Sequence, residues 1–483
     1  MAVSNWLNER VPQTVPCDDT VGDHVRQFVY HKANRDAYVA FGLEYLKRKA
    51  QARADTYDVV VVGAGIHAAT YLYTLRQQRP HLRVLLVEKT STVSSTFAEF
   101  GDSLVLNSPT FQQVDLNSNV VPGHFVQTSD FDELHEKVFP TARHIFDLAV
   151  MVLLHSDADI LFNVEVHGVE RVADGYRLTT STTDVVGRSV VIANGMGALN
   201  ETAYSGPRST GALVSGDCFV RRCFEDTVYA DSLSGKTVAI VGDGDTANCV
   251  LEYILPIVYP NKLYGFYREN PALPARVYWL GQSAACLKAF FFNSKRRYSH
   301  SGGIIEVFWQ EDSSLELPSD VRESASDMLR IVPDKLVEVR SSPAGLTLVT
   351  DRDAMDVDVA IDCTGRFNPL CARLLHDGYD TVHGDIVFQG GFWCQAEDRF
   401  VPKPHTLEGR AIACRVRGQD VFVLGGACPL GELIADSEAR NGAAKYQEGR
   451  VSLTNSKWSL EHALPRTVAF AKQHAQALAA RDT

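Results

Sequence analysis

The most regular pattern of apolar and polar positions lies between residues 58 and 88. Residues 58 to 62 read D-V-V-V-V, a β-branched apolar run of the kind that forms a parallel strand buried on both faces. Apolar residues at helical spacing follow, at Ile66, Ala69 and Tyr73. A second short apolar run ends at Glu88. The pattern predicts a strand, a tight turn, a helix and a second strand, which together make one β-α-β unit.

The turn between the first strand and the helix has the sequence G-x-G-x-x-A, from Gly63 to Ala68. Gly63 allows a sharp exit from the strand, Gly65 lets the backbone approach a pyrophosphate, and Ala68 lets the helix pack close to the sheet. The positive end of the helix dipole would face the pyrophosphate, and Glu88 would accept hydrogen bonds from ribose hydroxyls. These residues predict a dinucleotide site, with an ordinary structural turn as the alternative.

A second unit of the same kind begins with the apolar run at residues 237 to 241. The turn after it repeats G-x-G-x-x-A, with Gly242, Gly244 and Ala247 at the three fixed positions. We interpret residues 262 to 267 as its second strand, which places Arg268 where the first unit has Glu88. Because an arginine can pair with a 2′-phosphate, this half is predicted to bind NADPH rather than NADH. A surface charge at a strand end is the alternative interpretation of Arg268.

Other segments show patterns that extend these two units. Residues 160 to 195 alternate like antiparallel strands and end in a buried run, which suits a strand that returns to the first nucleotide-binding sheet. Residues 356 to 362 form another buried strand, which we assign to that sheet as well. Residues 421 to 427 are predicted to be a strand followed by a glycine turn, and we expect Gly426 in this turn to contact the cofactor.

The two ends of the chain have helical patterns. Residues 35 to 48 are predicted to be helical, within an extension that precedes the first strand. This extension could pack on the core, cover the mouth of the site or contact a second subunit, and packing on the core is favoured. The chain is again predicted to be helical from residue 460 onward.

Composition narrows the class of protein. The chain has 483 residues, 45% of them hydrophobic and 22% charged, which indicates a globular protein of more than one domain. Its net charge of −12 argues against binding to nucleic acid or to an anionic membrane surface. The N-terminus lacks the pattern of a signal peptide and no apolar run could span a bilayer, so we expect a cytoplasmic protein. The ten cysteines include no C-x-x-C pair, so neither a metal site nor a dithiol redox centre is predicted.

Taken in order, these motifs resemble the two-dinucleotide-binding flavoproteins. The stretch D-V-A-I-D-C-T-G, from Asp358 to Gly365, is similar to the D-x-x-x-x-A-T-G stretch of one group among them, the class B flavin monooxygenases. That group contains the flavin-containing monooxygenases and the lysine and ornithine N-hydroxylases. The resemblance implies an α/β fold with two Rossmann-like domains, one for FAD and one for NAD(P), the second inserted in the first, and a helical N-terminal extension.

The resemblance and the patterns together divide the chain into four parts. We expect an N-terminal extension at residues 1–54, an FAD-binding domain at residues 55–203 and 350–450, an NADPH-binding domain at residues 204–349, and a helical tail at residues 451–483.

The resemblance also implies a chemistry. FAD would be reduced by NADPH and would react with O2, and a C4a-hydroperoxyflavin would hydroxylate the nitrogen of a small amine or amino acid. The segment S-L-V-L-N ending at Asn107 resembles the one that carries an asparagine beside the flavin, so Asn107 and the adjacent Ser108 are the predicted catalytic residues. An Asn before Ser-Pro is also a common turn, which is the alternative. Thr364 and Gly365 are expected to contact the cofactors.

Two departures from the family pattern leave other functions open. No G-G-x-W follows Glu88, and Thr210 stands where the fingerprint F-x-G-x-x-x-H has its histidine, which argues against Baeyer–Villiger chemistry. The alternatives are a flavin oxidoreductase or dehydrogenase that inserts no oxygen, and a nucleotide-binding protein without catalysis. The substrate and the oligomeric state are left open, and a homo-oligomer is among the states allowed.

Overall fold

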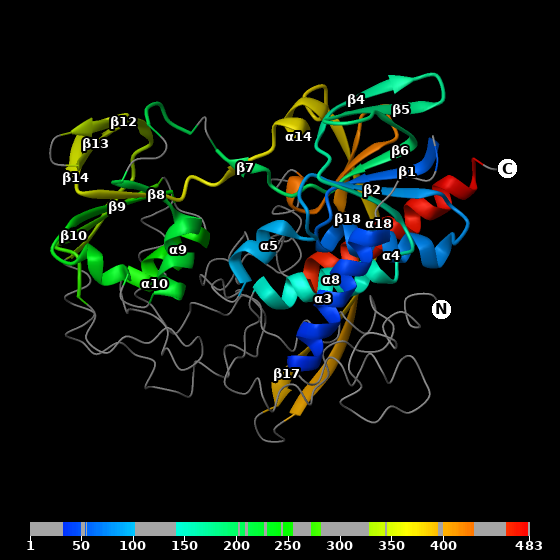
Figure 1. Cartoon of the computed structure of the whole chain (residues 1–483), viewed down its shortest axis with the longest axis horizontal. Coiled ribbons are helices and arrows are strands. Elements are labelled where there is room, and N and C mark those ends of the chain that lie inside the picture. The colour runs from blue at the N-terminus through cyan, green and yellow to red at the C-terminus, as the bar shows by residue number, and fades with distance from the viewer. Residues whose placement is uncertain are drawn as a thin grey trace.

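The structure is a computed structural model that describes thirteen stretches of the chain: residues 32–49, 54, 56–101, 142–200, 203–207, 211–226, 229–242, 245–254, 272–281, 328–342, 345–394, 399–428 and 460–481. Within them, two α/β units are joined by two short linkers that pair as β7 (Ala198–Leu199) and β16 (Arg366–Phe367) (Figure 1). Each unit has its own sheet, which is mixed in the first unit and parallel in the second.

The first unit is built on a nine-stranded sheet with the order β17-β18-β19-β6-β1-β2-β3, to which β4 and β5 are attached through β6. Its strands are β1 (Thr56–Val62), β2 (Val84–Glu88), β3 (Asp159–Phe162), β4 (Val166–Val172), β5 (Gly175–Thr180), β6 (Val185–Ile192), β17 (Tyr379–Cys394), β18 (Arg399–Val416) and β19 (Val421–Leu424). The strands β1, β2, β3, β6 and β19 are parallel to one another, whereas the pairs β17–β18, β18–β19, β4–β5 and β5–β6 are antiparallel.

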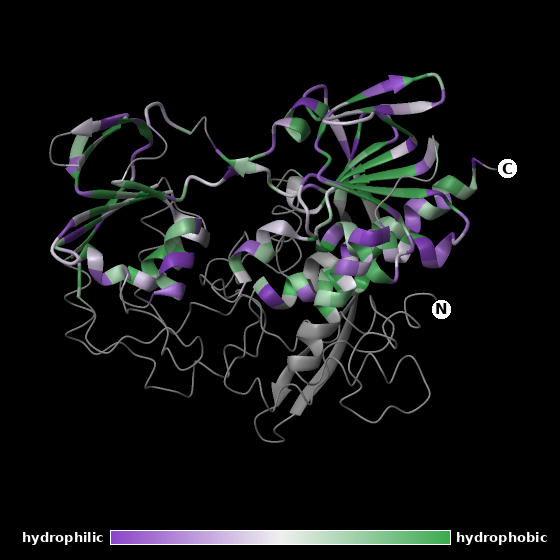
Figure 2. Cartoon of the chain, viewed as in Figure 1, coloured by the Kyte–Doolittle hydropathy of each residue, from purple (hydrophilic) through white to green (hydrophobic). Residues whose placement is uncertain are grey.

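Both faces of this sheet are covered, as the uninterrupted apolar run in β1 predicts. Val59 and Val61 belong to one buried cluster, and Val60 and Val62 belong to another on the opposite face. Successive residues of a strand point to opposite faces, so a strand covered on both sides is apolar at every position. Figure 2 shows the central strands of the first unit as hydrophobic along their length.

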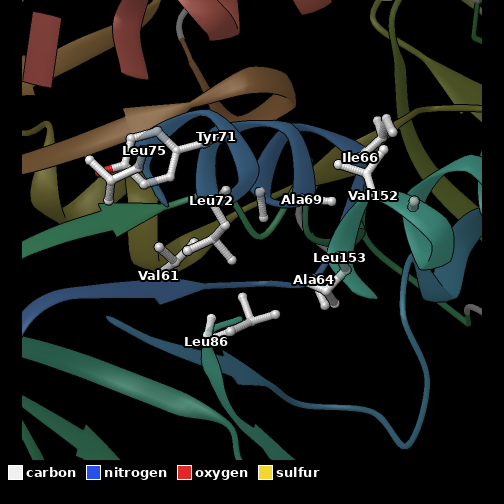
Figure 3. Packing of buried hydrophobic residues seen from close by; sticks show 14 of the residues in the cluster. Val61, Ala64, Ile66, Ala69, Tyr71, Leu72, Leu75, Leu86, Val152 and Leu153 are labelled. Atoms are coloured by element: carbon white, nitrogen blue, oxygen red, sulfur yellow. The ribbon is translucent and has the colours of Figure 1, made fainter. Parts of the chain in front are cut away.

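Four helices cover one face of the sheet. They are α3 (Lys32–Lys49), α4 (Ile66–Gln78), α8 (Ala142–Leu154) and α18 (Leu460–Ala479). Figure 3 shows α4 packing on Val61 and Leu86 of the sheet and on Val152 and Leu153 of α8. Val39 of α3 is buried in the same cluster, which confirms core packing for this part of the N-terminal extension. The other face is covered by β4, β5 and α14 (Pro369–Leu374).

The second unit has a parallel sheet with the order β11-β10-β9-β15-β8. Its strands are β8 (Leu213–Ser215), β9 (Thr237–Val241), β10 (Arg276–Leu280), β11 (Leu329–Val332) and β15 (Val359–Asp362). The helices α9 (Gly216–Glu225) and α10 (Asp245–Ile254) accompany it, together with an antiparallel layer of β12 (Leu336–Ser342), β13 (Gly345–Thr350) and β14 (Ala354–Val357). Because these elements lie between β6 and β17 in sequence, the second unit is inserted in the first, which confirms the predicted fold class.

Two sequence interpretations are corrected by the strand order. The strand beside β9 is β10, Arg276–Leu280, and not residues 262–267, which lie outside the described residues. Both stretches are short, apolar and aromatic, so the pattern did not distinguish them. In addition, β15 pairs with β8 and β9 in the second sheet, and the boundary drawn between residues 349 and 350 falls inside β13. A buried strand has the same pattern in either parallel sheet, so its sequence does not reveal which sheet it joins.

Among the residues that the structure describes, no helix is long and apolar enough to cross a membrane.

Candidate nucleotide-binding sites

Gly63 has a backbone conformation that requires glycine. Its φ is +95°, and a Cβ atom there would lie 2.5 Å from the Cα of Asn194 at the end of β6. Its N–H donates to the carbonyl of Val87 at 2.7 Å, which ties the turn to β2. The close approach of the β1 turn to β6 therefore depends on the missing side chain.

Gly65 has a different environment, because the space that its side chain would take is open. The nearest protein atom to a Cβ there would be the carbonyl oxygen of Ala193, 4.0 Å away. Gly65 directly precedes α4, and its carbonyl accepts the N–H of Ala69 at 3.0 Å. The N–H groups of a helix's first turn lack partners within the helix and attract anions. The open space at this helix end fits a pyrophosphate, whose binding there stays a prediction.

Ala68 and Glu88 both lie next to this turn, Ala68 in the core and Glu88 in hydrogen-bond contact with the turn. Ala68 is fully buried in the core beneath α4. Glu88 is 6% exposed, and its Oε2 accepts the N–H of Ala64 at 2.8 Å. Its Oε1 accepts the N–H and the hydroxyl of Thr90, at 2.9 and 2.8 Å. A carboxylate has about four acceptor positions, so a further acceptor position is left on Oε2, and a ribose contact there stays a prediction. The sequence missed this bracing role of Glu88.

The late glycine turn contacts α4 through Gly425. Gly425 begins the short helix η6 (Gly425–Ala427) with a φ of +69°, and a Cβ there would lie 2.6 Å from the His67 ring. The Nδ1 atom of His67 is in turn 2.9 Å from the hydroxyl of Thr467 on α18. Gly426 is the next residue of η6 and is half-buried. A cofactor contact by Gly426 stays a prediction.

In the second unit, Gly242 repeats the geometry of Gly63. Its φ is +111°, and a Cβ there would lie 2.2 Å from the carbonyl oxygen of Cys363. Its N–H donates to the carbonyl of Leu280 at 2.8 Å, and its own carbonyl accepts the indole N–H of the buried Trp279 at 2.8 Å. Ala247 is fully buried on α10. Gly244 and Arg268 lie outside the described residues.

The stretch from Asp358 to Gly365 serves mainly to hold the second unit together. Asp358 accepts the N–H of Thr237 at the start of β9, at 2.7 Å. Asp362 accepts the N–H and hydroxyl of Thr364, at 3.0 and 2.7 Å, and the hydroxyl of Tyr204 at 2.6 Å. Gly365 has a φ of +88°, with no protein atom within 4 Å of the Cβ position. The Thr364 hydroxyl is thus engaged within the protein, and a cofactor contact by Thr364 or Gly365 stays a prediction.

Several cysteines distant in sequence meet in the core of the first unit. Cys371, Cys414 and Cys428 are all buried in one cluster. A hydrogen bond with Cys428, together with burial, raises the pKa of the Cys414 thiol. Burial also raises the pKa of the Cys363 thiol, with smaller contributions from Asp362 and Asp217. The thiols of Cys363 and Cys414 therefore stay protonated and are poor nucleophiles.

The predicted catalytic residues Asn107 and Ser108 lie outside the described residues. Within the thirteen described stretches, no group of His, Cys, Asp and Glu side chains is arranged to hold a metal ion.

Comparison with known proteins gives matches to solved structures only. No family model and no curated protein matches the chain. Among solved structures, an L-lysine 6-monooxygenase from Pseudomonas syringae is 14% identical, with a TM-score of 0.48 over 88% of this chain and 99% of that one. The ornithine N-hydroxylase of Kutzneria sp. 744 is 16% identical, with a TM-score of 0.46 over 89% and 100%. A bacillithiol disulfide reductase from Bacillus cereus is 12% identical, with a TM-score of 0.47 over 88% and 99%. The fold assignment rests on the strand order and register of the chain's own sheets.

Proposed function

We propose that the chain is an FAD- and NADPH-dependent monooxygenase that hydroxylates the nitrogen of a small amine or amino acid. The observation that carries the proposal is the open space at Gly65, in front of α4, in a chain whose second β-α-β unit is inserted in the first. A turn built around a fixed Gly63 and an open Gly65 suits a dinucleotide better than it suits a purely structural role.

The residues of the first unit fit FAD. The first turn of α4 would bind the pyrophosphate, Gly65 would give it room, and the remaining acceptor position of Glu88 would take a ribose hydroxyl. In the second unit, Gly242 and the start of α10 would do the same for NADPH. FAD, when bound, supplies the chemistry that couples NADPH oxidation to the reaction of O2.

Two considerations favour oxygen insertion over simple electron transfer. The stretch from Asp358 to Gly365 resembles that of the class B monooxygenases. The thiols of Cys363 and Cys414 are buried and have raised pKa values, so neither suits the thiolate of a disulfide reductase, which is one of the electron-transfer alternatives. Asn107 and Ser108 are the proposed residues at the flavin, where the chain must also keep water out.

Removing the open space tests whether the first unit binds FAD. Gly65→Val would fill the place proposed for the pyrophosphate, and we expect a folded protein that is colourless after purification. Gly211→Val is the matched control, because no atom lies within 4 Å of a Cβ at that position. Flavin content by absorbance and melting temperature are measured together. If the Gly65→Val protein has the normal yellow colour, the flavin does not bind at this turn.

The reaction type is tested by incubating the purified protein with NADPH, labelled O2 and a panel of small amines and amino acids. A monooxygenase places one labelled oxygen atom in the product for each NADPH consumed. NADPH oxidation that continues without O2, on an artificial electron acceptor, with no labelled product in air, would assign a reductase instead.

A further inference from the structure

The two linkers between the units pair over a very short length. The strands β7 and β16 pair at two positions, Arg366 with Leu199 and Phe367 with Ala198. Figure 1 shows the linkers crossing between the units, and the second linker leads directly into α14 of the first unit. Because an isolated pair of short strands is marginally stable, the direction of the linkers depends on how their ends are attached.

The side chain of Asn368 attaches the second linker to the first unit. Its Nδ2 donates to the Oδ1 of Asn194 at 2.7 Å and to the carbonyl of Gly195 at 2.8 Å. Its Oδ1 accepts the N–H of Cys371 at 3.1 Å and so caps α14. Both the donor and the acceptor end of the amide are therefore engaged, which fixes the side chain. We call Asn368 and the two oxygens that accept from it the Asn368 clamp.

The clamp lies beside the first nucleotide-binding turn. Asn194 comes just after β6, and a Cβ atom on Gly63 would lie 2.5 Å from the Asn194 Cα. Near the other end of the same linker, Arg366 bonds to Asp217 on α9 of the second unit. The second linker is thus attached at both ends, through Asn368 to the Gly63 turn and through Arg366 to the second unit.

We infer that Asn368 is a positioning residue for electron transfer, because its clamp ties the linker from the second unit to the turn of the first. The inference rests on the proposed function, in which a hydride passes from NADPH to FAD and leaves NADP⁺ and reduced flavin. Such a transfer needs reacting atoms about 3–3.5 Å apart, and a misplacement of about 1 Å can cost about 100-fold in rate. Loss of the clamp should slow the transfer while both nucleotides still bind.

Asn368→Asp removes the clamp and keeps the helix cap. Aspartate is a good N-cap residue, and its carboxylate can still accept the Cys371 N–H, but it has no N–H to donate to Asn194 or Gly195. We expect normal flavin content and normal affinity for NADP⁺ by calorimetry on the full-length protein. The rate of flavin reduction at saturating NADPH should fall by about tenfold or more. Reduction by dithionite, which does not use the second unit, should be unchanged.

Asn194→Asp is the matched control, because it adds the same charge to the same contact but keeps an oxygen that accepts from Asn368. Its rate of flavin reduction should stay near that of the wild type. Hydrogen exchange followed by mass spectrometry tests the clamp without any cofactor reaction. The N–H of Asn200 donates to the carbonyl of Gly365 at 3.1 Å across the linkers, so exchange over residues 195–200 should be faster in Asn368→Asp and not in Asn194→Asp.

Reduction rates, or exchange rates, that are equal in Asn368→Asp and the wild type would overturn the inference alone. Equal slowing of reduction in both variants would assign the effect to the added charge, and loss of flavin from Asn368→Asp would assign Asn368 to the fold of the first unit. Either result would also overturn the inference. A wild type whose bound flavin is not reduced by NADPH would overturn the proposed function, and the inference with it.

Discussion

At the scale of single residues, Glu88 connects the parts of the first nucleotide-binding turn. Its carboxylate is nearly buried and accepts from Ala64 on one oxygen and from Thr90 on the other. All three donors are fixed by the backbone or by a short side chain, so only an acceptor-rich group suits the position. The same side chain therefore shapes the turn and, under the proposed function, would offer its remaining acceptor position to a ribose.

Replacing Glu88 with glutamine should destabilise the turn. An amide has one acceptor oxygen and a donor group, so one buried N–H would face another donor in Glu88→Gln. We expect a loss of about 1–3 kcal/mol in the free energy of unfolding, and weaker flavin retention. Glu170→Gln, at an exposed position on β4, is the control. Equal melting temperatures and flavin contents for the two variants would show that the Glu88 contacts contribute neither to stability nor to flavin binding.

At the scale of elements, α18 joins the C-terminal part of the chain to α4. The hydroxyl of Ser189 on β6 donates to the carbonyl of Asp420 at 3.0 Å, so the Nε2 of His474, at 3.1 Å, donates to the Ser189 oxygen. The Nδ1 of His474 then accepts the hydroxyl of Tyr71 at 2.6 Å. His474 is 3% exposed, and a neutral imidazole satisfies both contacts, as donor at Nε2 and as acceptor at Nδ1.

The stability of this helix contact should depend on pH. Burial, together with the charges of Arg481 and Arg415, lowers the pKa of His474 to about 3, and the charge of Asp420 opposes this shift. The unfolded chain binds this proton at its ordinary pKa of about 6.5, so the stabilisation is complete above that pH and is lost as pH falls toward 3. The slope is about 1.4 kcal/mol per pH unit.

Melting temperatures measured between neutral pH and pH 4 test this expectation. The melting temperature of the wild type should exceed that of His474→Gln at neutral pH, and this difference in melting temperature should become smaller as pH falls. His376→Gln, which changes an exposed histidine, should follow the wild type throughout. A difference in melting temperature between the wild type and His474→Gln that stays constant with pH would mean that His474 is not held neutral in the core.

The elements that could be predicted from the sequence are those with a local cause. The strand β1, the turn at Gly63 and the helix α4 each follow from apolar periodicity and from steric demands within a few residues. The prediction that Arg268 ends the second strand of the second unit required knowing which distant segment pairs with β9. That pairing is decided by long-range packing. The contact of His67 with Gly425 and Thr467 is also long-range, and the glycine after a strand is its only trace in the sequence.

At the scale of the whole molecule, the two units are connected by a narrow ribbon. Leu199 on β7 is 42% exposed and Phe367 on β16 is 43% exposed, so the paired linkers have little core of their own. Arg366 bonds to Asp217 on α9 and donates to the carbonyl of Gly197 at 3.3 Å, which fastens the ribbon to the second unit. The relative placement of two cofactors would depend on this connection.

A substitution in the ribbon should affect electron transfer more than flavin binding. Gly197 has a φ of +88°, and a Cβ there would lie 2.0 Å from the carbonyl oxygen of Phe367. In Gly197→Ala we expect normal flavin content and a rate of flavin reduction by NADPH that is lower by about tenfold or more, because the reacting groups are misplaced. Gly195→Ala is the control, with a φ of +70° but no atom within 4 Å of the Cβ position. Similar reduction rates in the two variants would exclude a role for the ribbon.

The most direct test of the proposed function is an anaerobic titration of the purified yellow protein with NADPH, followed at the visible absorbance of the flavin. If the first unit holds FAD and the second delivers electrons from NADPH, equimolar NADPH should bleach the flavin, and NADH should do so far less effectively. A protein that takes up no FAD, or whose bound flavin keeps its colour with excess NADPH, would contradict the assignment of both units.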